Sequence, residues 1–285
     1  MSTETAPAAG TLYVVATPIG NLADISHRGL QVLQQVAVIA AEDTRHSKGL
    51  LDHYNISARL LSLHDHNETQ RAQQLLMKLS EGLDIALISD AGTPLISDPG
   101  YQLVNLCRRN NIRVIPVPGA CALITALSAS GLPTDQFTFF GFLPVKEMAR
   151  REQLAMLKSA RGTAVFYESP RRILDSVLLL IEELGADRQL ALAKELTKTF
   201  ETFRTGPAAE IAQWLQADPV HQKGEFVLMV GPETNSKDTI PGEAITLLTT
   251  LMQELPLKKA AAITAGHYKL KKNALYQLGL QLQGE

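Results

Sequence analysis

Short apolar runs separated by helical patterns are the feature of the first half of this chain that most limits its fold. The runs lie at residues 11–17, 38–41, 60–63, 84–88 and 113–117, and the helical patterns at 26–36, 47–54, 67–79, 101–110 and 120–130. Strands of nearly unbroken apolar sequence that alternate with helices are typical of a parallel sheet covered on both faces. The sequence therefore predicts an α/β domain over residues 11–131.

The second half has a different rhythm after a linker-like segment, Gly131-Leu-Pro-Thr-Asp135. Strand-like runs lie at 137–142, 163–167, 190–194, 198–204 and 226–230, with helical patterns at 146–158, 171–184 and 208–215. Several strands without long crossovers favour a mixed sheet, which predicts a second α/β domain over residues 135–233. A polar stretch at 234–239 then leads to a small helical domain, 240–285, with a turn expected at Gly266.

Composition and charge favour an ordinary soluble chain. It is 45% hydrophobic and 20% charged with a net charge of −2, so the overall charge predicts neither a nucleic-acid nor a membrane partner. No basic-then-apolar leader pattern and no apolar run near the roughly 18 residues of a membrane span is present. We expect a cytoplasmic protein in which Cys107 and Cys121 are buried free thiols.

Local basic zones modify that picture. Residues 146–172 hold seven Lys or Arg against three Glu, and residues 256–274 hold five Lys and no acid. Such zones can bind a polyanion, although solvated helices produce them just as readily. Both interpretations stay open for the Lys-rich tail.

The segment Asp84–Gly100 is the strongest indication of a site. An apolar strand ends at Ser89-Asp90 in a loop of small residues, and a new helix is expected to start at Pro99. Open α/β sheets bind ligands where such loops meet at the carboxyl ends of the strands. Small residues let a ligand approach the backbone, and Asp90 offers a fixed acceptor.

Two further loops are expected at the same edge of the sheet. Thr17-Pro-Ile-Gly-Asn21 and Pro118-Gly-Ala-Cys-Ala122 each follow a strand and combine rigid with small residues. A third loop, Glu42-Asp-Thr-Arg45, is explained equally well by a helix cap at Asp43 or Thr44 and by a binding site.

Polar residues elsewhere allow more than one interpretation. His64 and His66 alternate at a strand end, where polar surface or substrate contact is favoured over a metal site. In the second half, charges abut apolar strands at Phe166–Arg172, Lys194–Glu201 and Lys223–Gly231. Surface ion pairs explain each segment alone, whereas together they indicate a cleft.

These segments taken together resemble one family. Thr17-Pro-Ile-Gly-Asn, Glu42-Asp-Thr-Arg, Ser89-Asp-Ala-Gly-Thr-Pro, Phe166-Tyr-Glu-Ser-Pro and Lys223-Gly-Glu-Phe occur in the order found in the ribosomal RNA small-subunit methyltransferase I family. The resemblance runs from about residue 11 to 231 and includes the Lys-rich tail. It implies two α/β domains of the tetrapyrrole-methylase type (class III SAM methyltransferase), a small C-terminal helical domain, and S-adenosylmethionine bound between the α/β domains.

The resemblance also implies an activity and a set of cofactor contacts. The activity is methylation of the 2′-hydroxyl of a cytidine in the decoding region of 16S rRNA, within the small ribosomal subunit, by a homodimer. The implied cofactor contacts are Asp90, Ala91, Gly92, Thr93, Pro94, Ile96, Ser97, Ala120, Cys121, Tyr167, Leu196, Gly224 and Glu225. Because the first-strand loop departs from the Gly-rich form of the wider superfamily, it is expected to face substrate.

Catalysis by positioning needs no metal, but a ribose hydroxyl must lose a proton during transfer. Glu168, Lys194 and Glu195 flank the expected cleft and are the candidate catalytic residues. Candidate RNA contacts are Arg45, His64, His66, Asn67, Arg171, Arg172, Lys258, Lys259, Lys269, Lys271 and Lys272. Two rival functions are methylation of a small molecule such as a tetrapyrrole, and RNA binding without catalysis by a ribosome-assembly protein.

Overall fold

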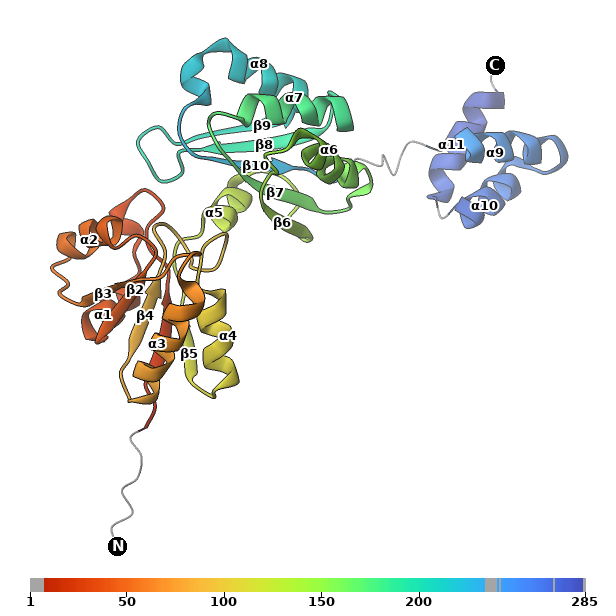
Figure 1. Ribbon diagram of the computed structural model, residues 1–285. Helices are drawn as coiled ribbons and strands as arrows, with labels where there is room; N and C mark the ends of the chain where they lie inside the picture. The colour runs from red at the N-terminus through yellow and green to blue at the C-terminus, as the bar shows by residue number, and fades with distance from the viewer. Residues whose placement is uncertain (1–7, 234–239, 241, 269, 284–285) are drawn as a thin grey trace, which may run out of the picture. The chain divides into compact units, whose positions relative to one another are not determined.

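The computed structural model describes residues 8–233, 240, 242–268 and 270–283. Contacts between residues divide the chain into two compact units, Met1–Pro232 and Glu233–Glu285. The first unit holds two sheets (Figure 1). The division of this unit into domains 11–131 and 135–233 stays a prediction.

The first sheet is entirely parallel, as the sequence predicted. Its strands, in spatial order, are β3 (Arg59–Ser62), β2 (Val38–Ala41), β4 (Ile85–Ile88), β1 (Thr11–Val15) and β5 (Arg113–Val117). Every residue of β2 and β4 is buried, because helices cover both faces. All five strands therefore present their carboxyl ends, and the loops that follow them, at one edge.

Two pairs of helices cover this sheet. The helices α1 (His27–Gln35) and α2 (Thr44–His53) pack on one face, and α3 (Glu68–Ser80) and α4 (Tyr101–Arg109) pack on the other. Side-chain caps start the first pair: the Ser26 hydroxyl accepts the Gly29 N–H, and the Asp43 carboxylate accepts the Arg45 N–H. The 3₁₀ turn η1 (Leu22–Asp24) precedes α1.

The second sheet is mixed. Its order is β6 (Phe137–Phe142), β7 (Thr163–Glu168), β10 (Phe226–Val230), β8 (Gln189–Lys194) and β9 (Thr202–Pro207); the neighbours β6 and β7 pair in parallel, and the other neighbouring pairs are antiparallel. The strand predicted at 198–204 is wrong by four residues at its start. Residues 195–201 instead form a loop, which we call the 195–201 loop.

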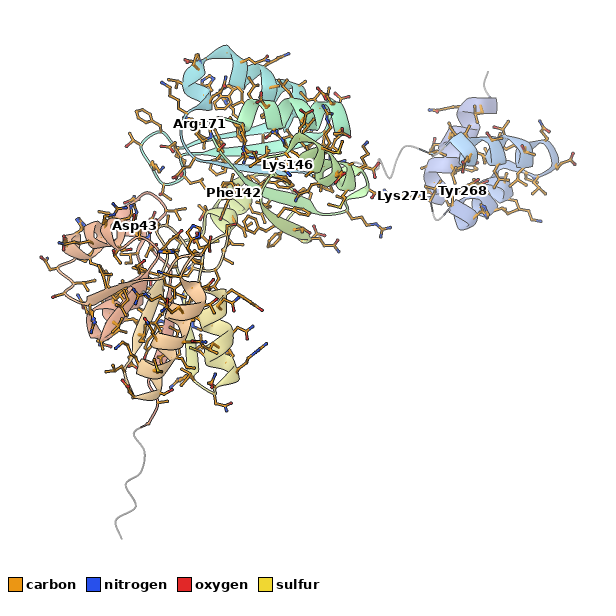
Figure 2. The ribbon with its side chains drawn as sticks, in the orientation of Figure 1. Asp43, Phe142, Lys146, Arg171, Tyr268 and Lys271 are labelled. Carbon is orange, nitrogen blue, oxygen red and sulfur yellow. The ribbon has the colours of Figure 1, made fainter. Side chains whose placement is uncertain are left out.

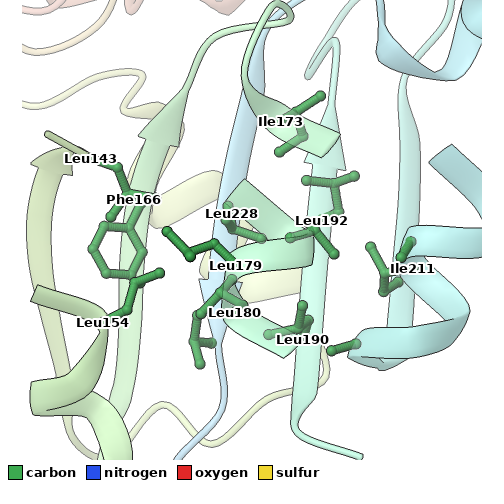
Figure 3. Close-up of a cluster of buried hydrophobic side chains, with 14 of the residues drawn as sticks. Leu143, Leu154, Phe166, Ile173, Leu179, Leu180, Leu190, Leu192, Ile211 and Leu228 are labelled. Atoms are coloured by element: carbon green, nitrogen blue, oxygen red, sulfur yellow. The ribbon is translucent and has the colours of Figure 1, made fainter. Parts of the chain in front are cut away.

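Helices cover the outer face of the second sheet. They are α6 (Glu147–Ala155), α7 (Ile173–Leu184) and α8 (Ala208–Ala217), with the 3₁₀ turns η2 (Met156–Ser159) and η3 (Pro219–Gln222). Figure 3 shows the core that they form, in which Phe166 is fully buried. Truncating a buried Phe to Ala typically costs about 3–5 kcal/mol, so this core fixes the direction of β7 and the residues at its end.

The inner face of the second sheet is covered from the first half of the chain. Helix α5 (Ala122–Ala129) packs on β7 and β10 (Figure 1). Ile19, from the loop after β1, is buried in the same cluster as Val165 and Met229. This shared apolar cluster joins the two sheets within one unit.

The second unit consists of three helices, α9 (Gly242–Glu254), α10 (Leu257–Tyr268) and α11 (Lys272–Gln283). Their core contains Leu248, Ala260, Ala261, Ala265 and Leu275. The turn predicted at Gly266 is wrong, because Gly266 lies inside α10. Packing of the alanine face overrides the ~1 kcal/mol that glycine costs a helix. Within the described residues, no helix is both long and apolar enough to cross a membrane.

Candidate functional site

A cavity of about 460 Å³ opens at the carboxyl edge of the first sheet. Both sheets contribute to its wall. The lining residues are Ile19, Glu42, Asp90, Ala91, Gly92, Thr93, Ile96, Ser97, Asp98, Cys121, Ala122, Phe142, Tyr167, Glu168, Ser169, Pro170, Ala193, Leu196, Glu225, Phe226 and Val227. We call this space the larger cavity.

Main-chain hydrogen bonds tie the loops after β1 and β4 together below the larger cavity. The Thr17 N–H donates to the Gly92 carbonyl at 2.9 Å, and the Gly92 N–H donates to the Thr17 carbonyl at 3.0 Å. Gly92 has a φ of +82°, and a β-carbon there would stand 3.2 Å from Ile19. Glycine therefore fits a position at which both the backbone angle and the space exclude larger residues.

The β4 loop continues in a strained conformation. Leu95 and Ser97 have φ values of +73° and +67°, a region that residues with side chains rarely adopt. Such strain persists where the surrounding structure fixes it, and it often marks functional sites. Here it turns Asp98 back to line the larger cavity.

The wall of the larger cavity is acidic. Burial, followed by the charges of Asp90, Asp98 and Asp65, raises the pKa of Glu42. Burial also raises the pKa of Asp98 to about 6, although a hydrogen bond from Ser89 opposes the change. Among the described residues that line the larger cavity, none is Lys or Arg, so these carboxylates face a site that lacks a protein cation.

The segment Glu42–Arg45 combines the two roles proposed for it. The Asp43 carboxylate caps α2, and its hydrogen bonds with Arg45 lower its pKa to about 2. The Asp43 N–H donates to the Asp90 carboxylate at 3.0 Å, while Glu42 lines the larger cavity. Figure 2 labels Asp43 and, at the end of β6, Phe142.

Aromatic residues form the opposite wall. Tyr167 contacts Phe139 and Phe142 edge-on, and its hydroxyl accepts the Leu123 N–H at 3.2 Å. Burial, together with Cys121, raises the pKa of Tyr167 to about 12. Cys121, expected to be buried, is partly exposed here, whereas Cys107 is buried.

Ten of the residues predicted to contact the cofactor line the larger cavity: Asp90, Ala91, Gly92, Thr93, Ile96, Ser97, Cys121, Tyr167, Leu196 and Glu225. Pro94, Ala120 and Gly224 do not line it. Pro94 is buried, the Ala120 carbonyl accepts the Thr93 hydroxyl at 2.9 Å, and Gly224 packs against the side chain of Glu195. These three residues lie outside the lining of the larger cavity. The assignment of the whole set to a cofactor stays a prediction.

Glu168 is held by three donors. Arg172 pairs with its carboxylate at 2.7 Å, the Ser169 N–H donates at 2.7 Å and the Ser176 hydroxyl at 2.8 Å. Its side chain is fully buried, and Arg172 also donates to the Leu143 carbonyl. This arrangement suits a residue that positions the loop after β7 better than one that accepts a proton.

The other two catalytic candidates lie beside the larger cavity without lining it. Burial opposes ionisation of Glu195, but hydrogen bonds from the Glu225 N–H and the Lys198 ammonium outweigh it and lower the pKa of Glu195. Lys194 is 6% exposed at the end of β8. None of the hydrogen bonds within the described residues uses its ammonium, whose charge helps to lower the pKa of Glu195.

The predicted RNA contacts lie outside the larger cavity. Arg45, His66 and Arg171 are exposed, while His64, Asn67 and Arg172 are partly buried. Lys258, Lys259, Lys271 and Lys272 are exposed on the C-terminal unit, and Lys269 lies outside the described residues. Arg172 pairs with Glu168, and the assignment of all these residues to RNA contact stays a prediction.

The basic zone at 146–172 is partly neutralised by acids that are distant in the sequence. Arg151 pairs with Glu147, Glu182 and Glu183, and Lys158 pairs with Glu183. The count of charges within 146–172 therefore overstates the positive charge of this zone, because it includes neither Glu182 nor Glu183.

Sequence reasoning missed several lining residues. Asp98 received no role of its own, although it follows Asp90 in the same loop, and Glu42 was considered only within a segment that a helix cap explained equally well. The apolar residues Ala193, Phe226 and Val227 carried no signal, because buried strands contain such residues everywhere. No group of three or more His, Cys, Asp or Glu side chains in the described part of the chain is arranged to hold a metal.

Comparisons with known proteins match this geometry to a family. Residues 11–212 match the family of Tetrapyrrole (Corrin/Porphyrin) Methylases, and residues 238–283 match the RsmI C-terminal HTH domain. Ribosomal RNA small subunit methyltransferase I of Vibrio cholerae serotype O1 is 55% identical to this chain over 96% of each sequence. The chain belongs to the ribosomal RNA small subunit methyltransferase I family. The protein of the same name from Pseudomonas aeruginosa is 51% identical over 97% of this chain and 99% of its own.

Membership in this family confirms two predictions from the sequence. The fold is that of the tetrapyrrole methylases followed by a helical domain, and the methyl donor of the family is S-adenosylmethionine. Uroporphyrin-III-C-methyltransferase from Thermus thermophilus shares the fold with a TM-score of 0.53 at 20% identity, covering 78% of this chain and 94% of its own. Diphthine synthase does so with a TM-score of 0.58 at 13% identity, covering 79% and 91%.

Proposed function

We propose that this chain methylates the 2′-hydroxyl of a cytidine in the decoding region of small-subunit ribosomal RNA, with S-adenosylmethionine as methyl donor. The observation that carries the proposal is the acidic larger cavity, which lies at the loops that follow the strands of the first sheet. The chain is also 55% identical to a small-subunit rRNA methyltransferase. The cytidine ribose as target comes from the motif resemblance described above.

The residues of the larger cavity fit this donor. S-adenosylmethionine supplies a methyl group on a positively charged sulfonium. Glu42, Asp90 and Asp98 provide negative charge without a competing Lys or Arg in the lining, and partial burial strengthens such attraction relative to water. A volume of about 460 Å³ lies within the range of roughly 300–1,000 Å³ typical of small-molecule sites.

The chain's part in the chemistry is to align the acceptor hydroxyl and to take or stabilise its proton. Lys194 supports this role, because the residue is only 6% exposed and its ammonium forms no hydrogen bond with the described residues. Asp98 is a second candidate, because its raised pKa suits a proton acceptor near neutral pH. Glu168 and Glu195 are positioning residues in this proposal, held by Arg172 and Lys198.

The RNA would be held largely by residues outside the larger cavity. Lys258 and Lys259 are exposed at the start of α10, and Lys272 is exposed at the start of α11. The match of this unit to an HTH domain supports contact with nucleic acid. We further propose a cytoplasmic homodimer that acts on the small ribosomal subunit.

Two measurements test the function. Calorimetry with S-adenosylmethionine should show binding, and labelled donor should transfer its methyl group to small subunits or 16S rRNA. Mapping of ribose methylation in rRNA from cells without this protein should reveal one missing 2′-O-methyl cytidine. An unchanged methylation map would overturn the proposed target.

The two rival functions predict different results. A binding protein without catalysis should take up no donor. A tetrapyrrole methylase should transfer methyl to a porphyrinoid and not to RNA, and it would leave the basic C-terminal unit without a role. Binding to RNA should weaken with added salt if the exposed Lys residues contact phosphates.

A further inference from the structure

A second cavity of about 220 Å³ lies on the other side of Asp90. It is lined by Thr17, Pro18, Gly20, Leu22, His46, Ser47, Leu50, Ser89 and Asp90. Asp90 therefore lines both cavities. We call this space the smaller cavity; the loop after β1, which the sequence predicted to face substrate, contributes Thr17, Pro18 and Gly20 to its wall.

An unpartnered hydroxyl lines the smaller cavity. Ser47 is 2% exposed, and its Oγ atom has no hydrogen-bond partner among the described residues. A buried hydroxyl without a partner costs about 1–3 kcal/mol. Because Ser47 is fixed on α2 by the bond from its N–H to the Asp43 carbonyl at 3.0 Å, a ligand in the smaller cavity can supply the missing hydrogen bond.

A second unpartnered hydroxyl lies beside the same loop. The Thr197 Oγ1 atom is buried without a hydrogen bond to the described residues. It lies 2.9 Å from the point where a β-carbon of Gly20 would stand, and Gly20 lines the smaller cavity. The loop after β1 is therefore flanked by two hydroxyls that form no hydrogen bond with any described residue.

The remaining wall suits a flat ring. Pro18, Leu22 and Leu50 supply apolar surface, while His46, Ser47 and Asp90 supply hydrogen-bonding groups. The Tyr54 hydroxyl donates to the Leu22 carbonyl at 2.6 Å and so helps to hold Leu22 in place. Enzymes that modify nucleic acids read an extruded base in this way, with apolar contact to its faces and hydrogen bonds to its edge.

We propose that the smaller cavity holds the extruded pyrimidine base of the acceptor nucleotide, with the Ser47 hydroxyl on its edge. The proposal rests on the proposed function. A base in the smaller cavity places its ribose next to Asp90, the residue shared with the larger cavity, and so brings the 2′-hydroxyl toward the donor. Ser47 is thus a specificity-determining residue for the acceptor.

The test uses full-length protein with three substitutions. Ser47→Ala removes the hydroxyl, Ser47→Leu fills the smaller cavity, and Ser80→Ala is the control. Ser80 is an exposed helical serine whose hydroxyl donates to the Leu76 carbonyl. Donor affinity is measured by calorimetry, and methyl transfer is measured on small subunits that carry cytidine or uridine at the target position.

We expect Ser47→Ala to lower kcat/KM for the cytidine subunit about tenfold, the loss typical of one hydrogen bond. Its preference for cytidine over uridine should fall as well. Ser47→Leu should lower transfer more than a hundredfold, while the donor Kd of both variants and the activity of Ser80→Ala stay within about twofold of the unchanged protein.

Three results would overturn the proposal. Unchanged transfer and base preference in Ser47→Ala would remove the role of the hydroxyl. Donor binding weakened tenfold by Ser47→Leu would assign the smaller cavity to the donor. Equal losses on cytidine and uridine in Ser47→Ala would indicate a merely structural effect. If the unchanged protein transferred no methyl group to RNA, the proposed function itself would fail, which is a different outcome from these three.

Discussion

The Thr197 hydroxyl oxygen lies 2.9 Å from the point where a β-carbon of Gly20 would stand, and the Leu196 carbonyl lies 3.0 Å from it. Gly20 belongs to the loop after β1 in the first sheet, and Thr197 belongs to the 195–201 loop of the second sheet. The two halves of the first unit therefore touch through a glycine that leaves no room for a side chain.

Gly20→Ala should destabilise the protein by about 1–3 kcal/mol, the usual cost of overpacking, and should slow methyl transfer. Gly49→Ala is the matched control, because nothing lies within 4 Å of a β-carbon at this helical glycine. That variant should gain about 0.5–1 kcal/mol from helix propensity. Denaturant unfolding measures both, and a Gly20→Ala variant as stable as the unchanged protein would contradict the close contact.

Glu168→Gln should cost about 3 kcal/mol, because it leaves the Arg172 guanidinium without its buried carboxylate. Asp43→Asn is the comparison at an exposed ion pair, whose Arg45 side chain is 91% exposed. Asn still caps the helix and the ion pair is exposed to solvent, so this change should cost much less than Glu168→Gln. Losses of similar size in the two variants would argue against a buried pair at Glu168.

Asp98→Asn should change how stability depends on pH. The pKa of Asp98 is raised from 3.8 in the unfolded chain to about 6 in the folded protein. The folded protein therefore binds more protons between these values, and the stabilising contribution, fully present below pH 3.8, is lost as the pH rises through 6. The variant should match the unchanged protein at low pH and melt at a higher temperature at pH 7.5, as calorimetry can show. A variant less stable at pH 7.5 would contradict this sign.

Asp98 should also make donor binding depend on pH. A cationic ligand favours the ionised carboxylate, so the affinity for S-adenosylmethionine should rise as the pH increases through about 6. Titrations between pH 5 and 7.5 in the unchanged protein and in Asp98→Asn measure this effect. The expected result is a flatter profile in the variant, and identical profiles would exclude Asp98 as the group that titrates.

Lys194→Met should separate stability from activity. The Lys194 side chain is buried, so replacing its charge with an apolar group of similar length should raise stability by about 1 kcal/mol. If the ammonium acts on the acceptor hydroxyl as proposed, methyl transfer should fall at least a hundredfold. Lys198→Met is the control, because its ammonium bridges Glu195 and Glu225, and its loss should lower stability. An active Lys194→Met variant would remove the catalytic proposal.

The sheets were predictable from the sequence because their strands are short, apolar and β-branched. The strand at β9 was misplaced because Thr199 and Phe200, like Thr202 and Phe203, are residue types that strands favour. The segment starts as a loop because Lys198 pairs with Glu225, which is distant in the sequence, and because Glu195 adopts a φ of +52°. Neither feature can be recognised from the local sequence pattern.

The candidate site was only partly predictable for the same reason. The loop after β4 could be recognised from its small residues, and it supplies six of the ten predicted cofactor contacts that line the larger cavity. Asp98 was missed because its position depends on the left-handed backbone at Leu95 and Ser97. Glu168 was named a catalytic candidate because it flanks the expected cleft, whereas its hydrogen bond from Ser176, eight residues away on the next helix, could not be inferred from the sequence.

The paired main-chain hydrogen bonds between Thr17 and Gly92 have a consequence for inhibitor design. A compound that contacts the main-chain atoms of these two loops interacts with groups that every amino acid except proline carries. Resistance mutations alter side chains. Few of them could change this main-chain surface without also breaking the hydrogen bonds that join the two loops.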